Sequence, residues 1–515
     1  MVFRTLIGRW FRYRRRSLVA LSCNRTVKCG LLILLLFSTL ITIWYQTLQS
    51  LNKSEERLNL HSNVTTRWRQ QTKHQHIHPA VQKGEQTFTG PNLFEQYCND
   101  PRNATVHGNE GQSPDGFTLR MVFILIRHGD RSPLHNIPGY TPPKINCDFE
   151  SWYTGNDKAY KQFPVRMRTN QVQNNYHFSN WSPVPNKLTC AIGSLTGRGA
   201  LQHLMLGRHF SQAYASLLNS KKTFKNQIKV TCTGTPRTYQ SVSALLYSFL
   251  PYYSLSDVDY KYASSIYFCD HDVWSRNMCF CKGAEVFRRK IKVYERMIEL
   301  RSQSASVLSE KLKSLFKADI SKLGGMSSVA DALAPGFCHN LQNSHLTSDR
   351  NFTIDRKLID EVWTEMTQVM YQHWNDTDKN REKFSSVNLY PLLTEIYQGI
   401  KHFIDGQHST KVWIYSGHDS TLTALLFVLG LNDGIWPPYA SRVNLELYES
   451  EAGSTSNRFY MKILYNGRDV TNDVNFCKHS TQFGLCDLKY FNEFVSNTML
   501  LRYGYNNFTA ACESF

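Results

Sequence analysis

Charged residues are scarce in this chain, and long apolar runs are almost absent. Asp, Glu, Lys and Arg make up 19% of the 515 residues, against 41% hydrophobic residues. This balance excludes a disordered polyelectrolyte and a polytopic membrane protein. No C-x-x-C occurs, and Cys279-Phe280-Cys281 has no matching Cys or His pair, so we expect no metal. The phosphate loop G-x-x-x-x-G-K-S/T is also missing, which argues against a sulfotransferase.

Acidic residues are absent from the first 29 positions, which carry eight basic ones. The net charge of +18 is typical of nucleic-acid binders. The densest basic run, however, directly precedes an uncharged apolar stretch at residues 30–45, so we predict no nucleic-acid partner. We predict instead a cytoplasmic tail over 1–29 and a transmembrane signal-anchor in the lipid bilayer over 30–46, oriented by the positive-inside rule. The short anchor favours the ER or the Golgi over the cell surface, and we predict a Golgi membrane protein, single-pass type II, with its folded domain in the lumen.

Sequons and cysteines beyond the anchor support a lumenal location. Asn180 begins a sequon that is followed by Pro183, which makes it a poor acceptor. The glycosylation candidates are Asn52, Asn63, Asn103, Asn351, Asn375 and Asn507. Eleven cysteines follow the anchor, and in an oxidising lumen most of them should form disulfides. The odd number leaves one thiol free or paired between chains, and we expect Cys98 to be the cross-chain partner.

The remaining chain divides into a polar stem and one catalytic domain. Residues 47–115 lack apolar periodicity and predict a lumenal stem; the alternating His74, His76 and His78 in it indicate a solvated linker. Residues 116–515 predict an α/β domain with a mostly parallel sheet flanked by helices and a helix-rich cap at roughly 250–400. The patterns that predict this domain are strands at 119–126, 412–415 and 443–448 and helices at 196–218, 241–250, 285–315, 359–374 and 421–429.

The first predicted strand runs directly into RHGDRSP at residues 127–133. Ligands of open α/β sheets bind at the carboxyl ends of strands, so we expect a site here. The guanidiniums of Arg127 and Arg131 suit a phosphate or sulfate oxyanion. Two arginines beside His128 also disfavour its protonation, and a neutral imidazole is what a nucleophile needs.

Two further segments present similar groups. The second strand runs into SGHDS at residues 416–420, and a short apolar run leads to TGTPRT at 233–238. Helix capping is the alternative explanation for Asp419, and an ordinary surface position is the alternative for Arg237. Taken together, the three segments predict one site that joins His418, Asp419 and Arg237 to the first segment.

RHGDRSP resembles the R-H-G-x-R-x-P signature of the histidine acid phosphatases, the larger branch of the histidine phosphatase superfamily. The resemblance extends to LTGRG at 195–199, RT at 237–238, GHD at 417–419 and PPYAS at 437–441. It implies a phosphomonoesterase without cofactor or metal. It also implies that His128 is the nucleophile and Asp419 the proton donor to the leaving alcohol. The residues implied to hold the phosphoryl oxygens are Arg127, Arg131, Arg237 and His418.

Within this family, the N-terminal anchor and the wording of the motifs are most similar to Golgi members that act on the proteoglycan linkage region. This resemblance implies removal of the 2-O-phosphate from xylose in a phosphorylated glycan on proteoglycan core proteins. It also implies a setting shared with a xylose kinase or linkage-region glycosyltransferases. The alternatives are an inositol polyphosphate or general acid phosphatase of the secretory pathway and an inactive phosphatase-fold protein that binds glycans.

Two isolated patterns suggest other sites. Asp257-Val258-Asp259 is a D-x-D, which would suit the metal and sugar nucleotide of a glycosyltransferase. His271-Asp272 is a second His-Asp pair, but no apolar strand precedes it. We therefore expect His418-Asp419 to be the functional pair.

Overall fold

The structure, a computed structural model, describes one compact unit within residues 93–513. Outside the description lie 1–92, 102–107, 139, 141, 170–176, 186–189, 219–225, 251–257, 270–280, 318–324, 341–353, 374–375, 377, 452–457, 479–480 and 514–515. The predicted tail, the predicted anchor and most of the predicted stem therefore lie outside the described residues, as do the sequons at Asn52, Asn63, Asn103, Asn351 and Asn375. Among the described helices, none is long and apolar enough to cross a membrane.

A nine-stranded mixed sheet forms the centre of the fold, in the order β3-β2-β4-β1-β5-β6-β9-β8, with β7 paired to β6. The strands are β1 Phe117–Arg127, β2 Ile228–Thr233, β3 Asp259–Ala263, β4 Val412–Gly417, β5 Arg442–Ser450, β6 Phe459–Tyr465, β7 Arg468–Asp469, β8 Thr481–Gln482 and β9 Leu485–Asp487. The pairs among β3, β2, β4 and β1 are parallel, and the pairs from β5 onward are antiparallel. The prediction of a mostly parallel sheet is therefore wrong for its second half. The link between β5 and β6, residues 451–458, is too short for the crossover that a parallel pair requires.

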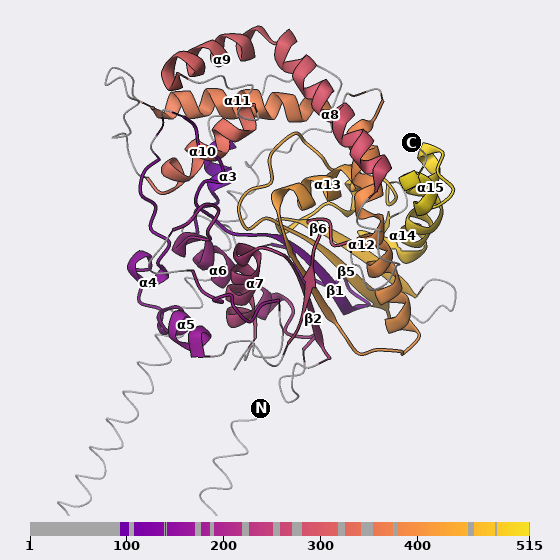
Figure 1. The fold of residues 1–515 in the computed structure, drawn as a ribbon. Helices are drawn as coiled ribbons and strands as arrows, with labels where there is room; N and C mark the ends of the chain where they lie inside the picture. The colour runs from indigo at the N-terminus through magenta and orange to yellow at the C-terminus, as the bar shows by residue number, and fades with distance from the viewer. Residues whose placement is uncertain are drawn as a thin grey trace, which may run out of the picture. The chain divides into compact units, whose positions relative to one another are not determined.

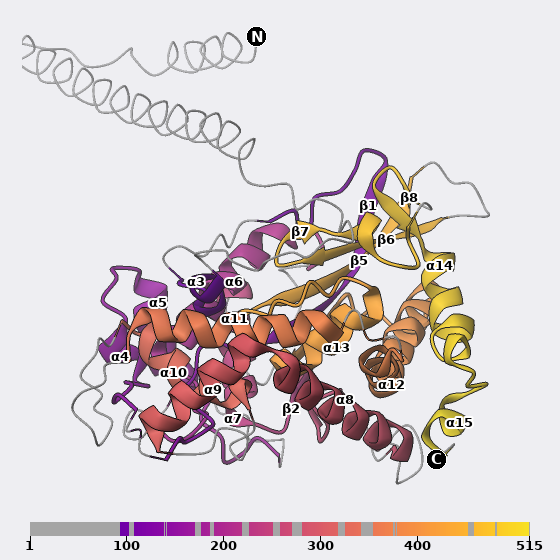
Figure 2. The ribbon, with the colours of Figure 1, turned by 90° about the horizontal axis from the view of Figure 1, so that it is seen from above.

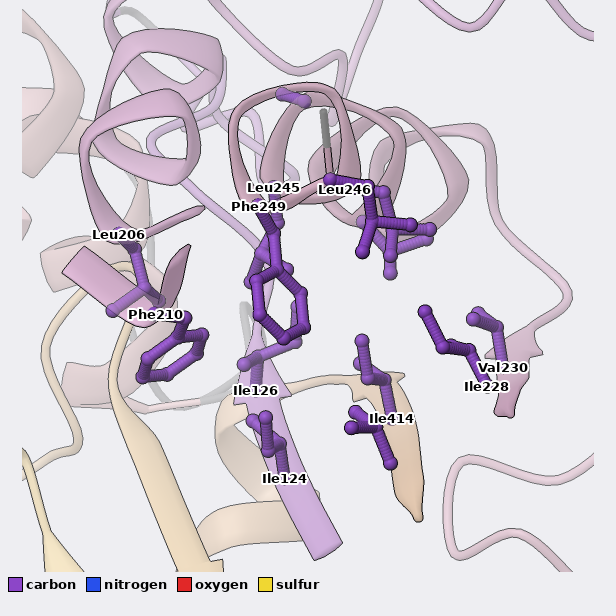
Figure 3. Close-up of a cluster of buried hydrophobic side chains, with 14 of the residues drawn as sticks. Ile124, Ile126, Leu206, Phe210, Ile228, Val230, Leu245, Leu246, Phe249 and Ile414 are labelled. Carbon is purple, nitrogen blue, oxygen red and sulfur yellow. The ribbon is translucent and has the colours of Figure 1, made fainter. Parts of the chain in front are cut away.

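Strand β1 is buried on both faces, because helices cover both sides of the sheet. Alternate β1 side chains, including Ile124 and Ile126, pack against α6 (Gly197–Ala213) and α7 (Pro236–Phe249). Figure 3 shows Ile124, Ile126 and Ile414 facing Leu206, Phe210, Leu245, Leu246 and Phe249 of these helices. The intervening β1 side chains, such as Phe123, pack with α12 (Asn380–Ile404) and α13 (Asp419–Leu429) on the other face. In Figure 1 the two helical layers lie on opposite sides of the strands.

Four helices form the cap: α8 (Lys282–Arg301), α9 (Gln303–Phe316), α10 (Met326–Cys338) and α11 (Arg356–Gln372). Figures 1 and 2 show them gathered at one end of the folded unit. The single helix expected at 285–315 is two helices, because Ser302 adopts an extended conformation and its hydroxyl accepts the N–H of Ala305 to cap α9. The cap is also narrower than the predicted 250–400, since Leu392 and Ile396 of α12 pack against the sheet.

The folded unit begins before residue 116, where we expected the stem to end. Residues Leu93–Cys98 form helix α3, whose Phe94 and Tyr97 are buried against Trp363 of α11. The ring centroid of Trp363 lies 5.3 Å from that of Phe94 and 4.3 Å from that of Tyr97. A helix this short gives almost no periodic signal in the sequence. The other elements are α4 Phe149–Trp152, α5 Lys158–Thr169, α14 Leu488–Glu493, α15 Phe508–Glu513, η4 Thr471–Asp473, η5 Phe494–Thr498 and η6 Leu501–Tyr503.

The disulfides correct the expectation for Cys98. This residue bonds to Cys338 within the same chain, because α3 lies beside the end of α10. The free thiol among the described residues is Cys232, which is buried on β2. Its burial raises its pKa, so it does not ionise readily. The other described bonds are Cys147–Cys190, Cys281–Cys512 and Cys477–Cys486, and Cys269 is also disulfide-bonded.

Candidate active site

The three predicted segments meet at one edge of the sheet. Strands β2, β4 and β1 are parallel neighbours, and their registers pair Arg127 with Gly417 and Cys232 with Ser416. Their carboxyl ends therefore lie at the same level, as the sequence predicts. The segments that follow these strands carry His128, His418 and Arg237.

His128 is 1% exposed and makes an informative hydrogen bond. Its Nδ1 lies 2.8 Å from the carbonyl oxygen of Gly129. A carbonyl can only accept, so Nδ1 carries the proton and the lone pair of a neutral ring is on Nε2. Burial, reinforced by the charges of Arg237 and Arg127, holds the pKa of His128 well below its usual range. This low pKa favours the neutral ring, whose unprotonated Nε2 could act as a base or a nucleophile.

Arg127 is fully buried and held on three sides. Its Nη1 donates to the carbonyl of Pro437 (2.5 Å), and its Nη2 donates to the hydroxyl of Tyr97 (3.0 Å) and pairs with Asp419 Oδ2 (2.9 Å). The ring of Tyr439 lies 4.3 Å from the guanidinium carbon. Three segments that are distant in sequence therefore fix one guanidinium beside His128.

Arg131 is held by a residue that sequence reasoning missed. Its Nη2 lies 2.5 Å from Oδ1 of Asp331, on cap helix α10. Asp331 Oδ2 also accepts the backbone N–H groups of Leu134 (2.8 Å) and His135 (3.0 Å). Burial raises the pKa of Asp331, but hydrogen bonding from His135 and the charge of Arg131 outweigh this and lower it. The signal in the sequence was a single acid within the otherwise apolar and small residues of α10.

Arg237 and His418 face each other. Nη2 of Arg237 lies 3.4 Å from Nδ1 of His418, which must accept, and His418 Nε2 donates to the hydroxyl of Thr233 at 2.9 Å. Burial and the charge of Arg237 lower the pKa of His418 to about 3. Burial and the charge of Arg131 lower the pKa of Arg237 to about 10. The ring of His418 meets that of His128 edge-on, with centroids 5.6 Å apart.

Asp419 is the first residue of α13, and its carboxylate has three donors. Oδ1 accepts the N–H of Ser420 (2.7 Å), and Oδ2 accepts from Trp436 Nε1 (3.1 Å) and from Arg127. The residue that caps α13 is His418, together with Thr421, so capping does not explain Asp419. Burial raises the pKa of Asp419, but the charges of Arg127 and Arg131 outweigh it and lower the pKa.

Asp130 occupies the variable position of the R-H-G-x-R-x-P signature, and its hydrogen bonds hold the signature loop in place. It is fully buried, and its Oδ1 accepts from Thr196 Oγ1 and His339 Nε2, each at 2.6 Å. Gly199 packs directly against this loop, because a Cβ there would lie 2.2 Å from the carbonyl oxygen of Asp130. The LTGRG motif therefore shapes the signature loop.

Three buried donors in this cluster have no hydrogen-bond partner among the described residues: the Nε atoms of Arg127, Arg131 and Arg237. Unsatisfied buried donors are costly, and an oxyanion is the ligand that satisfies guanidiniums best. The described residues contain no cluster of His, Cys, Asp and Glu that could hold a metal ion. The chemistry of the donor set is therefore that of a phosphate or sulfate site.

The isolated patterns do not join this site. Asp259 is the register partner of Lys229 at the start of strands β3 and β2, which is the end of the strands opposite the site. Asp257 lies outside the described residues. His271-Asp272 also falls outside them. Of the residues that the sequence predicted for the site, His128, Asp419, Arg127, Arg131, Arg237 and His418 are all described and all meet at this edge of the sheet.

The chain is similar to several known proteins. Residues 118–466 match the family model described as "Histidine phosphatase superfamily (branch 2)". The chain is 29% identical to "2-phosphoxylose phosphatase 1" of Xenopus tropicalis, over 81% of each chain. It is 27% identical to the protein of that name in Homo sapiens, over 81% of this chain and 85% of that one. A crystal structure of a Bifidobacterium longum multiple inositol polyphosphate phosphatase is 14% identical, with a TM-score of 0.49 over 78% of this chain and 97% of that one. The family match spans most of the folded unit and includes all six residues that the sequence predicted for the site, so the chain belongs to branch 2 of the histidine phosphatase superfamily.

Proposed function

We propose that this chain hydrolyses phosphomonoesters through a phosphohistidine at His128, and that its substrate is xylose 2-phosphate in the linkage region of proteoglycans. The observation that supports the mechanism best is the Nδ1–H of His128 donating to the Gly129 carbonyl. This bond leaves Nε2 unprotonated in the middle of three arginines, where a phosphoryl group would bind.

In the first step, Nε2 of His128 attacks phosphorus in line with the ester oxygen. An N–P bond forms as the P–O ester bond breaks. Arg127, Arg131 and Arg237 bind the phosphoryl oxygens, and the guanidiniums stabilise the charge that spreads over those oxygens in the transition state. His418 joins them when the phosphoryl dianion raises its pKa and Nδ1 takes up a proton, because Nδ1 without substrate only accepts from Arg237. Because Arg127 is anchored by Pro437 and Tyr97, this stabilisation requires little reorganisation.

Asp419 donates a proton to the leaving alcohol, since an alkoxide leaves poorly. It must therefore be protonated in the complex, although Arg127 and Arg131 lower its pKa in the structure. A bound phosphoryl dianion opposes those charges and raises the pKa of Asp419. In the second step, Asp419 takes a proton from water, the water attacks phosphorus, and the N–P bond breaks to release inorganic phosphate.

The charge of the site suits a monophosphate better than a polyphosphate. With Asp419 protonated in the complex, three guanidiniums face one carboxylate, that of Asp331, which pairs with Arg131. The small positive excess matches one phosphoryl group, whereas an inositol polyphosphate requires many more cations. This observation favours a sugar monophosphate over the inositol alternative.

The choice of xylose 2-phosphate follows the relatives named 2-phosphoxylose phosphatase 1. With it we propose the location predicted from the sequence: a type II anchor at 30–46 in the Golgi bilayer and a catalytic domain in the lumen. The substrate would be carried on proteoglycan core proteins, in the compartment of a xylose kinase and the linkage-region glycosyltransferases.

The test is phosphate release by the full chain, purified in detergent, from a linkage tetrasaccharide phosphorylated on xylose. We expect turnover by the wild type and none by His128→Ala, with an unchanged melting temperature. Inositol hexakisphosphate and p-nitrophenyl phosphate serve as the comparison substrates. Full activity in His128→Ala would exclude the phosphohistidine mechanism. Turnover of inositol hexakisphosphate without turnover of the tetrasaccharide would exclude xylose 2-phosphate as the substrate.

A further inference from the structure

We propose that Trp436 is a positioning and specificity residue of this site: its indole N–H orients Asp419, and its ring contacts the sugar that departs with the ester oxygen. The inference deepens the proposed function and rests on it. Trp436 directly precedes the PPYAS segment but belongs to none of the motifs that identify the site.

The hydrogen bond places Trp436 against the proton donor. Its Nε1 lies 3.1 Å from Asp419 Oδ2, the same oxygen that Arg127 Nη2 approaches to 2.9 Å. The next residue, Pro437, accepts Nη1 of Arg127 through its carbonyl. One short segment therefore positions both the guanidinium that binds the phosphoryl group and the acid that protonates the leaving oxygen.

The same geometry places the indole beside the leaving group. To transfer its proton, Asp419 must come within hydrogen-bond distance of the ester oxygen. A pyranose attached to that oxygen then lies within reach of the ring whose N–H touches the same carboxylate. Trp436 is only half-buried, with its inner part packed against the cap cluster that contains Trp363. We propose that the exposed part of the indole contacts the C–H groups of the sugar.

The two roles of Trp436 can be separated by two substitutions. Trp436→Phe keeps a ring but removes the N–H, whereas Trp436→Ala removes both. Trp413→Phe is the matched control: Trp413 packs on Phe123 in the core, and its Nε1 has no hydrogen-bond partner among the described residues. It lies near the start of β4, at the end of the strand opposite the site.

The experiment measures kcat and kcat/KM of the full chain across pH with two alkyl phosphates, a xyloside 2-phosphate and methyl phosphate. An N–H that stabilises the carboxylate keeps the pKa of Asp419 low. In Trp436→Phe we therefore expect the high-pH limb of kcat to move up by about one pH unit for both substrates. In Trp436→Ala we expect an additional loss of about tenfold in kcat/KM for the xyloside relative to methyl phosphate.

Trp413→Phe should leave both the pH limb and the substrate ratio unchanged. An unmoved limb in Trp436→Phe, or an unmoved ratio in Trp436→Ala, would overturn the proposal. Equal effects of Trp436→Phe and Trp413→Phe would also overturn it, because they would indicate general packing. If the wild type acted on methyl phosphate but not on the xyloside, the proposed substrate would be wrong. The proposed contact between the Trp436 ring and the sugar would then be wrong as well.

Discussion

At the scale of single residues, the assignment of Asp419 as the acid makes a prediction about leaving groups. Asp419→Asn cannot donate a proton, so we expect kcat/KM for the xyloside 2-phosphate to fall on the order of 10²–10⁴-fold. The kcat/KM for p-nitrophenyl phosphate should fall far less, because p-nitrophenolate departs without a proton and the second step, in which Asp419 activates water, does not enter kcat/KM. Steady-state kinetics on both substrates checks this, and equal slowing would remove Asp419 as the acid.

Asp331 makes a second prediction at this scale, because it competes with phosphate for Arg131. The carboxylate lies 2.5 Å from the guanidinium, and its own pKa is lowered. Asp331→Asn leaves Arg131 without an anion until phosphate binds. We therefore expect inorganic phosphate to inhibit this variant about tenfold more tightly than the wild type.

The inhibition constant for phosphate is the measurement, and Asp360→Asn is the control. Asp360 pairs with Arg356 in an exposed ion pair on α11, so its loss should leave phosphate binding unchanged. Weaker or equal phosphate inhibition in Asp331→Asn would show that Asp331 does not oppose the ligand at Arg131.

At the scale of elements, the Cys98–Cys338 bond joins the two helices that reach the arginines from outside the sheet. Helix α3 brings Tyr97 to Arg127, and α10 brings Asp331 to Arg131. Replacing both cysteines by serine should lower the free energy of unfolding by about 2–4 kcal/mol. It should also lower kcat/KM well below the melting temperature, since both guanidiniums lose part of their support.

Cys477–Cys486 provides the matched control for this bond. Its two cysteines are 9 residues apart in sequence, whereas Cys98 and Cys338 are 240 residues apart. The bond contacts none of the site residues described above. Its double serine variant should lose less stability, by chain entropy, and keep its kcat/KM. Denaturant unfolding and initial rates measure both effects, and an unchanged kcat/KM in the Cys98 and Cys338 variant would contradict the expectation.

The sequence predicted some helices and strands of the fold correctly and missed others. Strands β1, β4 and β5 and helices α6, α7, α11 and α13 form where apolar periodicity predicted them. The antiparallel half of the sheet and helix α3 were not predicted, because strand direction depends on pairing partners and a six-residue helix gives little periodicity. The break at Ser302 has a local cause, but a serine within a helical pattern does not by itself end a helix.

At the scale of the whole molecule, one buried carboxyl links stability to pH. Glu446 on β5 accepts hydrogen bonds from Gly111 N (2.7 Å), Tyr214 Oη (2.9 Å) and Tyr448 Oη (2.7 Å). Burial raises its pKa from 4.5 to about 7. Between these two values the folded state keeps a proton that the unfolded state releases. The free energy of unfolding should therefore fall as pH rises through this window, by about 3 kcal/mol.

Glu446→Gln resembles the protonated acid and should abolish this fall. We expect the variant and the wild type to have similar stability near pH 5, and the variant to be the more stable near pH 8. Urea unfolding at both pH values measures the difference. Glu361→Gln, at an exposed ion pair with Lys311, is the control. A difference between Glu446→Gln and wild type that did not change with pH would show that Glu446 does not carry the linkage.

The sequence by itself determined the chemistry of the site. RHGDRSP, TGTPRT and SGHDS each follow an apolar strand, and parallel strands bring their carboxyl ends to one edge, so the six candidate site residues could be named without a structure. Their proposed roles follow from the resemblance to the histidine acid phosphatases. Only the tertiary structure decided what holds them. Tyr97, Asp331, His339 and Trp436 come from a short helix, a cap helix and its end, and a loop, and their contacts with the site depend on packing between segments up to 209 residues apart. Periodicity reports which face of an element is buried, but not which distant side chain it meets.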